Sequence, residues 1–202
     1  PDTSYLAVVD SDGNSVSMTP SDFPMTPMVP GTGLTLGNRM TQFRLNPEHP
    51  SSLEPGKRPR VTPHAHTVTK DGEFYMSFGT PGGEMQTQAL LQVFLNHVVF
   101  GMNIQESIET PRVRSVNFPD SFAPHSYTPG TVEIERSLYE SVGKGLEDKG
   151  YDVDVYDDWD EVETGGDQFG GVCAAIEGDD GLIGGADPRV ESWAGGDTSR
   201  YF

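Results

Sequence analysis

Cysteine is almost missing from this sequence of 202 residues, because Cys173 is the only one. A single thiol excludes a disulfide within the chain and any metal cage made of thiolates. Basic residues are also scarce: 13 Lys and Arg stand against 31 Asp and Glu, which gives a formal net charge of -18. Such a charge opposes binding to nucleic acid or to an anionic membrane surface, so we expect neither partner.

Long apolar runs are absent as well. No stretch approaches the roughly 18 apolar residues of a membrane-spanning helix, and the first residues lack the charged start and apolar segment of a secretion signal. We therefore expect a soluble chain. Its length and its 34% hydrophobic residues fit one domain over residues 1–202, and 24 Gly and 16 Pro predict many loops.

Hairpin signals appear twice in the first half of the chain. Residues 5–9 and 15–18 flank an Asp-Gly turn, and residues 66–69 and 73–78 flank a second one. The nearly continuous apolar run in the first strand favours a strand that is covered on both faces. Between the hairpins, residues 19–65 show no sustained period, which predicts a long loop that contains short strands near 33–37.

Helical spacing of apolar residues predicts a helix over 84–100. Two further helices are predicted over 104–109, before Pro111, and over 132–149, ended by Gly150. Strands are predicted again at 151–156, 172–177 and 181–184. The order is strands, helices, strands, with hairpins in place of helical crossovers. This order favours an α/β (α+β) fold of antiparallel sheets in layers over a doubly wound parallel sheet.

Four short blocks, in this order along the chain, resemble the small subunit of the gamma-glutamyltransferase family. The blocks are Thr3-Ser4-Tyr5-Leu6-Ala7-Val8-Val9-Asp10 with Asp12-Gly13-Asn14, then Gly56-Lys57-Arg58-Pro59, then Thr80-Pro81-Gly82-Gly83, and finally Gly185-Ala186-Asp187-Pro188-Arg189. Together they extend over nearly the whole chain, and the block between residues 29 and 39 looks closer to the oxamate-amidohydrolase-like branch of that family.

The resemblance implies a four-layer αββα N-terminal-nucleophile hydrolase that cuts its own precursor before a threonine. This chain would be the C-terminal small subunit, and a separate large subunit from the same precursor would complete the fold. The resemblance implies no cofactor and no metal. Any targeting segment would lie on the large subunit, so the compartment stays open, with the cytoplasm slightly preferred to the periplasm.

Thr3 would be the nucleophile by this resemblance. A threonine hydroxyl is a weak nucleophile until a base takes its proton, and a free α-amine, with a pKa near 8, can be that base. Taken alone, Thr3 would be an ordinary β-branched strand residue. Pro1 and Asp2 precede it, so we expect a cut that removes them. The alternative is a catalytically silent homologue that binds a small molecule or a partner.

The resemblance gives two further catalytic roles. Gly82 and Gly83 would offer backbone N–H groups to the tetrahedral oxyanion at the entrance to a helix, although a tight turn would use the same glycines. Ser21 would bond to the nucleophile and orient it, and its alternative is a turn serine after Pro20.

At the positions that match the family's substrate contacts, this sequence has other residue types. Its paired serines fall at Val61 and Thr62, its asparagine at Phe23 and its acid at Gln42, so binding of a γ-glutamyl α-carboxylate and α-amine in the usual way is not expected. Arg39 is predicted to bind a substrate carboxylate bidentately, or to form a structural ion pair.

The predicted activity is cleavage of a small amide, γ-glutamyl-like or oxamate-like, through a threonine acyl-enzyme, with transfer to an amine as a close variant. A γ-glutamyl substrate would connect the enzyme to glutathione metabolism. His64 and His66 share the spacing of one strand face, but no further metal ligand follows at motif spacing, so we expect a packing or pocket role for them.

Overall fold

The computed structural model describes residues 3–21, 27–159 and 168–196. Its strands are β1 (Leu6–Val9), β2 (Ser15–Met18), β3 (Ala65–Lys70), β4 (Glu73–Gly79), β5 (Val113–Ser115), β6 (Thr131–Glu135), β7 (Asp152–Tyr156), β8 (Cys173–Gly178) and β9 (Gly181–Ala186). Its helices are the 3-10 helix η1 (Arg39–Gln42), α1 (Met85–Val98), α2 (Ile104–Glu109) and α3 (Arg136–Glu147).

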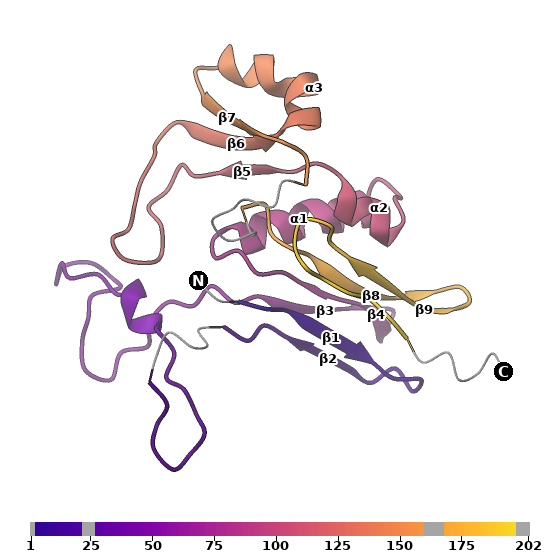
Figure 1. Cartoon of the computed structure of the whole chain (residues 1–202), viewed down its shortest axis with the longest axis horizontal. Coiled ribbons are helices and arrows are strands. Elements are labelled where there is room, and N and C mark those ends of the chain that lie inside the picture. The colour runs from indigo at the N-terminus through magenta and orange to yellow at the C-terminus, as the bar shows by residue number, and fades with distance from the viewer. Residues whose placement is uncertain (1–2, 22–26, 160–167, 197–202) are drawn as a thin grey trace.

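Layers are stacked around a four-stranded antiparallel sheet of order β3-β4-β8-β9 (Figure 1). Helices α1 and α2 cover one face of this sheet, and the β1–β2 ribbon lies against the other face (Figure 1). A third sheet, β5-β6-β7, packs through β5 against α1 and carries α3. The chain therefore has a mixed α/β fold with antiparallel sheets, as its sequence predicts.

The main core lies between the central sheet and the two helices. Met85, Ala89 and Val93 lie at helical spacing on the buried side of α1, each fully inaccessible to solvent. They meet apolar residues of β4 and β8, such as Met76 and Ile176. Helix α2 begins with a capping box at Asn103, whose side chain accepts a hydrogen bond from the Glu106 N–H group, as helix starts require.

The β1–β2 ribbon forms as predicted, in the register Leu6 to Met18. The Asp10 carboxylate accepts hydrogen bonds from backbone N–H groups within the turn, and Gly13 supplies the positive φ of 80°. Within the described residues, the central sheet covers one face of the ribbon and the other face, on which side chains alternate with those of the first, is turned away from it. Val8 on that outer face is 60% exposed.

Two predictions are wrong: the start of one helix and the presence of strands near 33–37. The helix expected over 132–149 begins only at Arg136, because residues 131–135 alternate and form β6, with Val132 and Ile134 buried. Strand β6 pairs in parallel with β7, an exception to the antiparallel rule of the other sheets. No strand forms at 33–37, where the described chain has only a single bridge from Thr35 to Met28 before η1 begins.

Four charged side chains form a buried network that joins distant parts of the chain. Arg112 lies 2.7 Å from Asp187, and Arg189 lies 3.0 Å from Asp187 and 2.7 Å from Glu135. All four are at most 2% exposed. The remaining arginine N–H groups donate mostly to carbonyl groups, including that of Ile108 at the end of α2. Asp187 and Arg189 belong to the fourth sequence block, whereas no motif identifies their partners Arg112 and Glu135.

Within the described part of the chain, no helix combines the length and the apolar character needed to cross a membrane.

Candidate active site

Thr3 lies at the entrance to β1, half-buried, and forms a bridge with Ser21 just beyond β2. The Ser4 N–H group donates to the Pro20 carbonyl at 2.9 Å, which continues the ribbon toward the start of the chain. The two hydroxyls, Thr3 Oγ1 and Ser21 Oγ, are 2.7 Å apart. The hairpin thus brings together the predicted nucleophile and the predicted orienting residue, although 18 positions separate them in the sequence.

Arg39 reaches this pair from the start of η1. Its Nη2 donates to Ser21 Oγ at 2.6 Å, and its Nη1 donates to Thr62 Oγ1 at 3.1 Å. The guanidinium also lies over the ring of Phe122, 5.5 Å from the ring centroid. Arg39 and Thr62, which the sequence suggests as separate substrate contacts, are here parts of one hydrogen-bonded network with the predicted nucleophile.

The Gly82–Gly83 turn connects β4 to α1. Both glycines have positive φ, 118° and 52°, a region that other residues rarely adopt. Their carbonyls accept the first hydrogen bonds of the helix, from the N–H groups of Met85 at 2.8 Å and Gln86 at 3.3 Å. Backbone N–H groups at such a helix start have no intrahelical partner, so they are available to bind a negative charge.

Two contacts set the Thr3 strand against this turn. The ring of Tyr5 lies so close to Gly79 that a Cβ there would be 2.2 Å from Tyr5 Cδ2. Since Gly79 ends β4, the first residues of β1 lie over the strand that leads into the turn. Phe122 lies between Arg39 and the Gly82–Gly83 turn. The Arg39 guanidinium lies over its ring, and a Cβ at Gly83 would be 3.9 Å from its Cε2 atom. Sequence reasoning missed Phe122, which lies in a loop without a motif.

The other predicted substrate residues are placed differently. Thr62 is 3% exposed and Val61, its neighbour, is 56% exposed, so they point into different surroundings. Gln42 is buried at the end of η1, at 2% exposed, and does not present its side chain to solvent. Phe23 lies outside the described residues.

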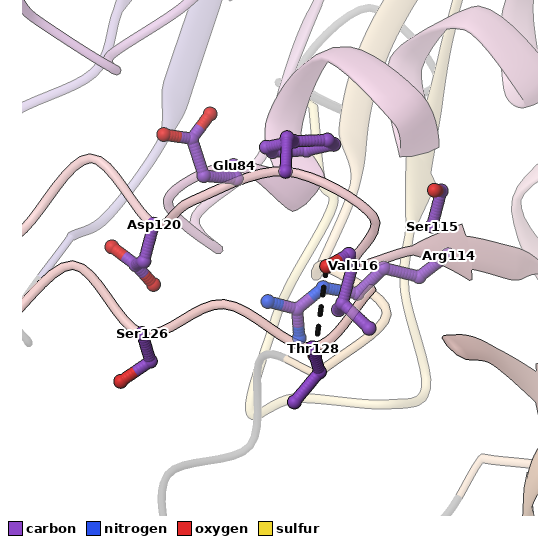
Figure 2. A pocket seen from close by; sticks show the side chains of 8 residues that line it. Glu84, Arg114, Ser115, Val116, Asp120, Ser126 and Thr128 are labelled. Carbon is purple, nitrogen blue, oxygen red and sulfur yellow. Dashed lines mark hydrogen bonds between the residues drawn. The ribbon is translucent and has the colours of Figure 1, made fainter. Parts of the chain in front are cut away.

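A small cavity lies on the side of the turn at Glu84, between the start of α1 and the loop after β5 (Figure 2). Its volume is about 150 Å³, well below the roughly 300 Å³ at which ligand pockets begin. Arg114 projects into it, and Thr128 donates to the Val116 carbonyl across its rim (Figure 2). Glu84 accepts from Arg60 at 2.9 Å and from Ser121. The cavity is therefore smaller than an ordinary ligand pocket.

His64 and His66 stack on each other, with ring centroids 5.8 Å apart, and His66 packs against Phe78. Burial and the neighbouring His64 lower the pKa of His66, which favours its neutral form. Among the described residues, no group of three or more His, Cys, Asp or Glu side chains could hold a metal ion. The contacts of the pair are those of packing residues.

Comparison with known proteins gives one family. The family model described as gamma-glutamyltranspeptidase matches residues 1–196. The chain is 33% identical over 201 residues to the glutathione hydrolase-like YwrD proenzyme of Bacillus subtilis, covering 96% of this chain and 36% of that protein. It is 29% identical over 199 residues to the oxamate amidohydrolase proenzyme of Klebsiella pneumoniae, covering 96% and 35%. The chain thus spans about a third of the length of these curated relatives.

A solved structure shares the fold. The gamma-glutamyltranspeptidase from Pseudomonas nitroreducens superposes with a TM-score of 0.73 at 24% identity, and the match covers 96% of this chain and 99% of that one.

Proposed function

The chain belongs to the gamma-glutamyltranspeptidase family, and from that membership we propose that it is the nucleophile-bearing part of an N-terminal-nucleophile amide hydrolase, with Thr3 as the nucleophile. One observation carries the proposal: the hydroxyl of Thr3, at the head of β1, is held 2.7 Å from that of Ser21. A nucleophile needs such a fixed hydroxyl, and a surface threonine does not.

The reaction begins with a cut between Asp2 and Thr3 that frees the α-amine of Thr3. The amine takes the proton of the Thr3 hydroxyl as Oγ1 attacks the amide carbon of the substrate. The negative charge that develops on the carbonyl oxygen is stabilised by backbone N–H groups of Gly82 and Gly83. When the tetrahedral intermediate collapses, the Thr3 α-amine passes its proton to the leaving amine of the substrate, which departs. The acyl group stays on Thr3 as an ester, and water hydrolyses this ester to release the acid and restore the hydroxyl.

The proposed substrate is a small amide. One relative is named a glutathione hydrolase-like protein and another an oxamate amidohydrolase. These two names support a γ-glutamyl-like or an oxamate-like acyl group. Transfer of the acyl group to an amine in place of water is a close variant of the same chemistry. Val61 and Phe23, which stand where the family has polar contacts to the γ-glutamyl group, favour a smaller or differently charged acyl group.

The proposed partner is a large subunit cut from the same precursor. The relatives are named proenzymes and are almost three times as long as the matched segment, which supports a second subunit. It would supply the fourth layer of the αββα sandwich on the outer face of the β1–β2 ribbon. Val8, Val16 and Met18 on this ribbon are all about half exposed or more, and an added layer would bury them.

Thr3→Ala in the full precursor tests the assignment. We expect loss of both self-cleavage and amide hydrolysis with an unchanged fold, because alanine has no hydroxyl to attack. Thr3→Ser should keep both reactions at a reduced rate, and Thr32→Ala, in an exposed turn, should change neither. Intact mass and N-terminal sequencing report the cut, and normal processing of Thr3→Ala would rule out Thr3.

The second candidate is a catalytically silent homologue that binds a small molecule or a partner. It is favoured by the altered substrate contacts, because Val61, Gln42 and Phe23 stand where the family has polar or acidic groups. A covalent amide-like probe separates the two. Acylation on Thr3 of the purified protein supports the hydrolase, whereas an unmodified Thr3 that is still joined to Asp2 supports the silent homologue.

A further inference from the structure

Arg39 occupies a position that a substrate contact alone does not explain. Two of its nitrogens are committed to hydroxyl groups of the protein, Nη2 to Ser21 and Nη1 to Thr62. A guanidinium can only donate hydrogen bonds, so both hydroxyl oxygens act as acceptors toward it. Ser21 therefore receives a charged hydrogen bond on the same oxygen that lies 2.7 Å from Thr3 Oγ1.

The charged hydrogen bond from Arg39 then favours one direction of the Thr3–Ser21 bond. A serine hydroxyl has one hydrogen to donate, and donation from a cation polarises it and strengthens it as a donor. The favoured arrangement has Ser21 donating to Thr3 Oγ1. The proton of Thr3 is then not used on Ser21 and can point to the α-amine that must take it.

From this geometry we propose that Arg39 is a positioning residue, which acts on the Thr3 nucleophile through Ser21 by fixing the direction of the Ser21 hydroxyl. The inference rests on the proposed function of Thr3. It replaces the carboxylate-binding role suggested by the sequence with a role inside the protein.

The neighbours of Arg39 hold its side chain in one position. Thr62, its second hydroxyl partner, is almost fully buried. The ring of Phe122 supports the guanidinium plane and lies near Gly83 as well, so Arg39 connects the Thr3–Ser21 pair to the turn that holds the proposed oxyanion donors. A planar cation with donors in a fork can make these contacts together, whereas a lysine ammonium lacks both the plane and the fork.

The two roles of Arg39 predict different kinetics. A substrate-carboxylate contact predicts a raised KM for acyl donors that carry the carboxylate and little change for neutral ones. A positioning residue predicts a fall in kcat for both kinds of donor at nearly constant KM. The rate of precursor self-cleavage should fall too, because the same hydroxyl attacks the Asp2 carbonyl and no added substrate takes part.

The experiment compares Arg39→Met and Arg39→Lys with the wild type in the full precursor and in the self-processed complex. Two anilide donors are used, one with an acyl carboxylate and one with a methyl group in its place. We expect Arg39→Met to lower kcat about 10- to 100-fold for both donors, with KM within about threefold, since misplacement of a nucleophile has effects of this size. Arg39→Lys should recover part of the loss, and Arg136→Met, an exposed arginine on α3, should match the wild type.

A double mutant separates action through Ser21 from a general loss of structure. Ser21→Ala combined with Arg39→Met should be no slower than Ser21→Ala alone, because Ser21→Ala already removes the hydroxyl through which Arg39 acts on Thr3. Additive losses, or an effect confined to KM for the carboxylate donor, would overturn the role of Arg39. A wild-type complex that is never acylated on Thr3 would overturn the proposed function itself, and the two failures are therefore distinct.

Discussion

Tyr5 shows how a single side chain aligns the candidate site. Ser17 donates its hydroxyl hydrogen to the His66 carbonyl at 3.0 Å, so the Tyr5 hydroxyl, 2.7 Å from Ser17 Oγ, must be the donor in that pair. The phenol is thus bound as a neutral group. Burial raises the pKa of Tyr5 to about 12. This residue, two positions after Thr3, fixes β1 on the central sheet.

The raised pKa of Tyr5 predicts a loss of stability at high pH. The folded-state value of about 12 lies above the ordinary value of 10, so the contribution is complete below pH 10 and is lost as the pH rises toward 12. We expect the free energy of unfolding, measured in urea, to fall more steeply between pH 10 and pH 11.5 in the wild type than in Tyr5→Phe. If the free energy of unfolding fell equally with pH in the wild type and in Tyr5→Phe, the neutral, buried state of the Tyr5 phenol would be contradicted.

At the scale of elements, Gly79 decides how closely β1 can approach β4. A Cβ at this position would overlap the Tyr5 ring, so the strand end must be glycine for the two layers to meet. Since the chain continues from Gly79 to the Gly82–Gly83 turn, this contact also sets the separation between the turn and the head of β1.

Gly79→Ala should therefore displace Tyr5 and with it Thr3. We expect a loss of about 1–3 kcal/mol in the free energy of unfolding, the usual cost of overpacking, and a slower acylation of Thr3. Gly145→Ala is the matched control, because its Cβ in α3 would meet no atom within 4 Å and alanine favours a helix. Urea unfolding and probe acylation measure both effects. Equal stability of the two variants would contradict the contact.

At the scale of the whole molecule, the buried charge network holds separate layers together. Arg112 precedes β5, Glu135 ends β6, and Asp187 and Arg189 follow β9, so the network joins the outer sheet to the central one. Two acids balance two bases. Buried charges that keep all their partners are tolerated, but removal of one leaves the others unpaired in a medium that solvates them poorly.

Asp187→Asn is expected to cost about 3–5 kcal/mol in the free energy of unfolding, because Arg112 and Arg189 both lose a carboxylate partner. Lys144→Ala, which breaks an exposed pair with Asp148, should cost less than about 0.5 kcal/mol. Chemical unfolding of the self-processed complex compares them. A loss in Asp187→Asn as small as in Lys144→Ala would mean that the network contributes little to holding the layers.

The sequence by itself determined the features that depend on neighbouring residues. The Asp-Gly turn specified the β1–β2 hairpin, and the spacing of apolar residues specified α1 and α2 almost to their ends. The sequence blocks also identified the family, and they predict Thr3 and the Gly82–Gly83 turn as site residues.

Only the tertiary structure decided what depends on contacts between distant residues. Residues 131–135 alternate as a strand does, but their parallel pairing with β7 joins segments that are distant along the chain. The sequence predicted Arg39 as a substrate-carboxylate contact or an ion-pair residue, whereas its contacts with Ser21, Thr62 and Phe122 come from three separate segments. The partners of a hydroxyl or a buried charge are chosen by the packing of layers, and that packing is a property of the whole chain.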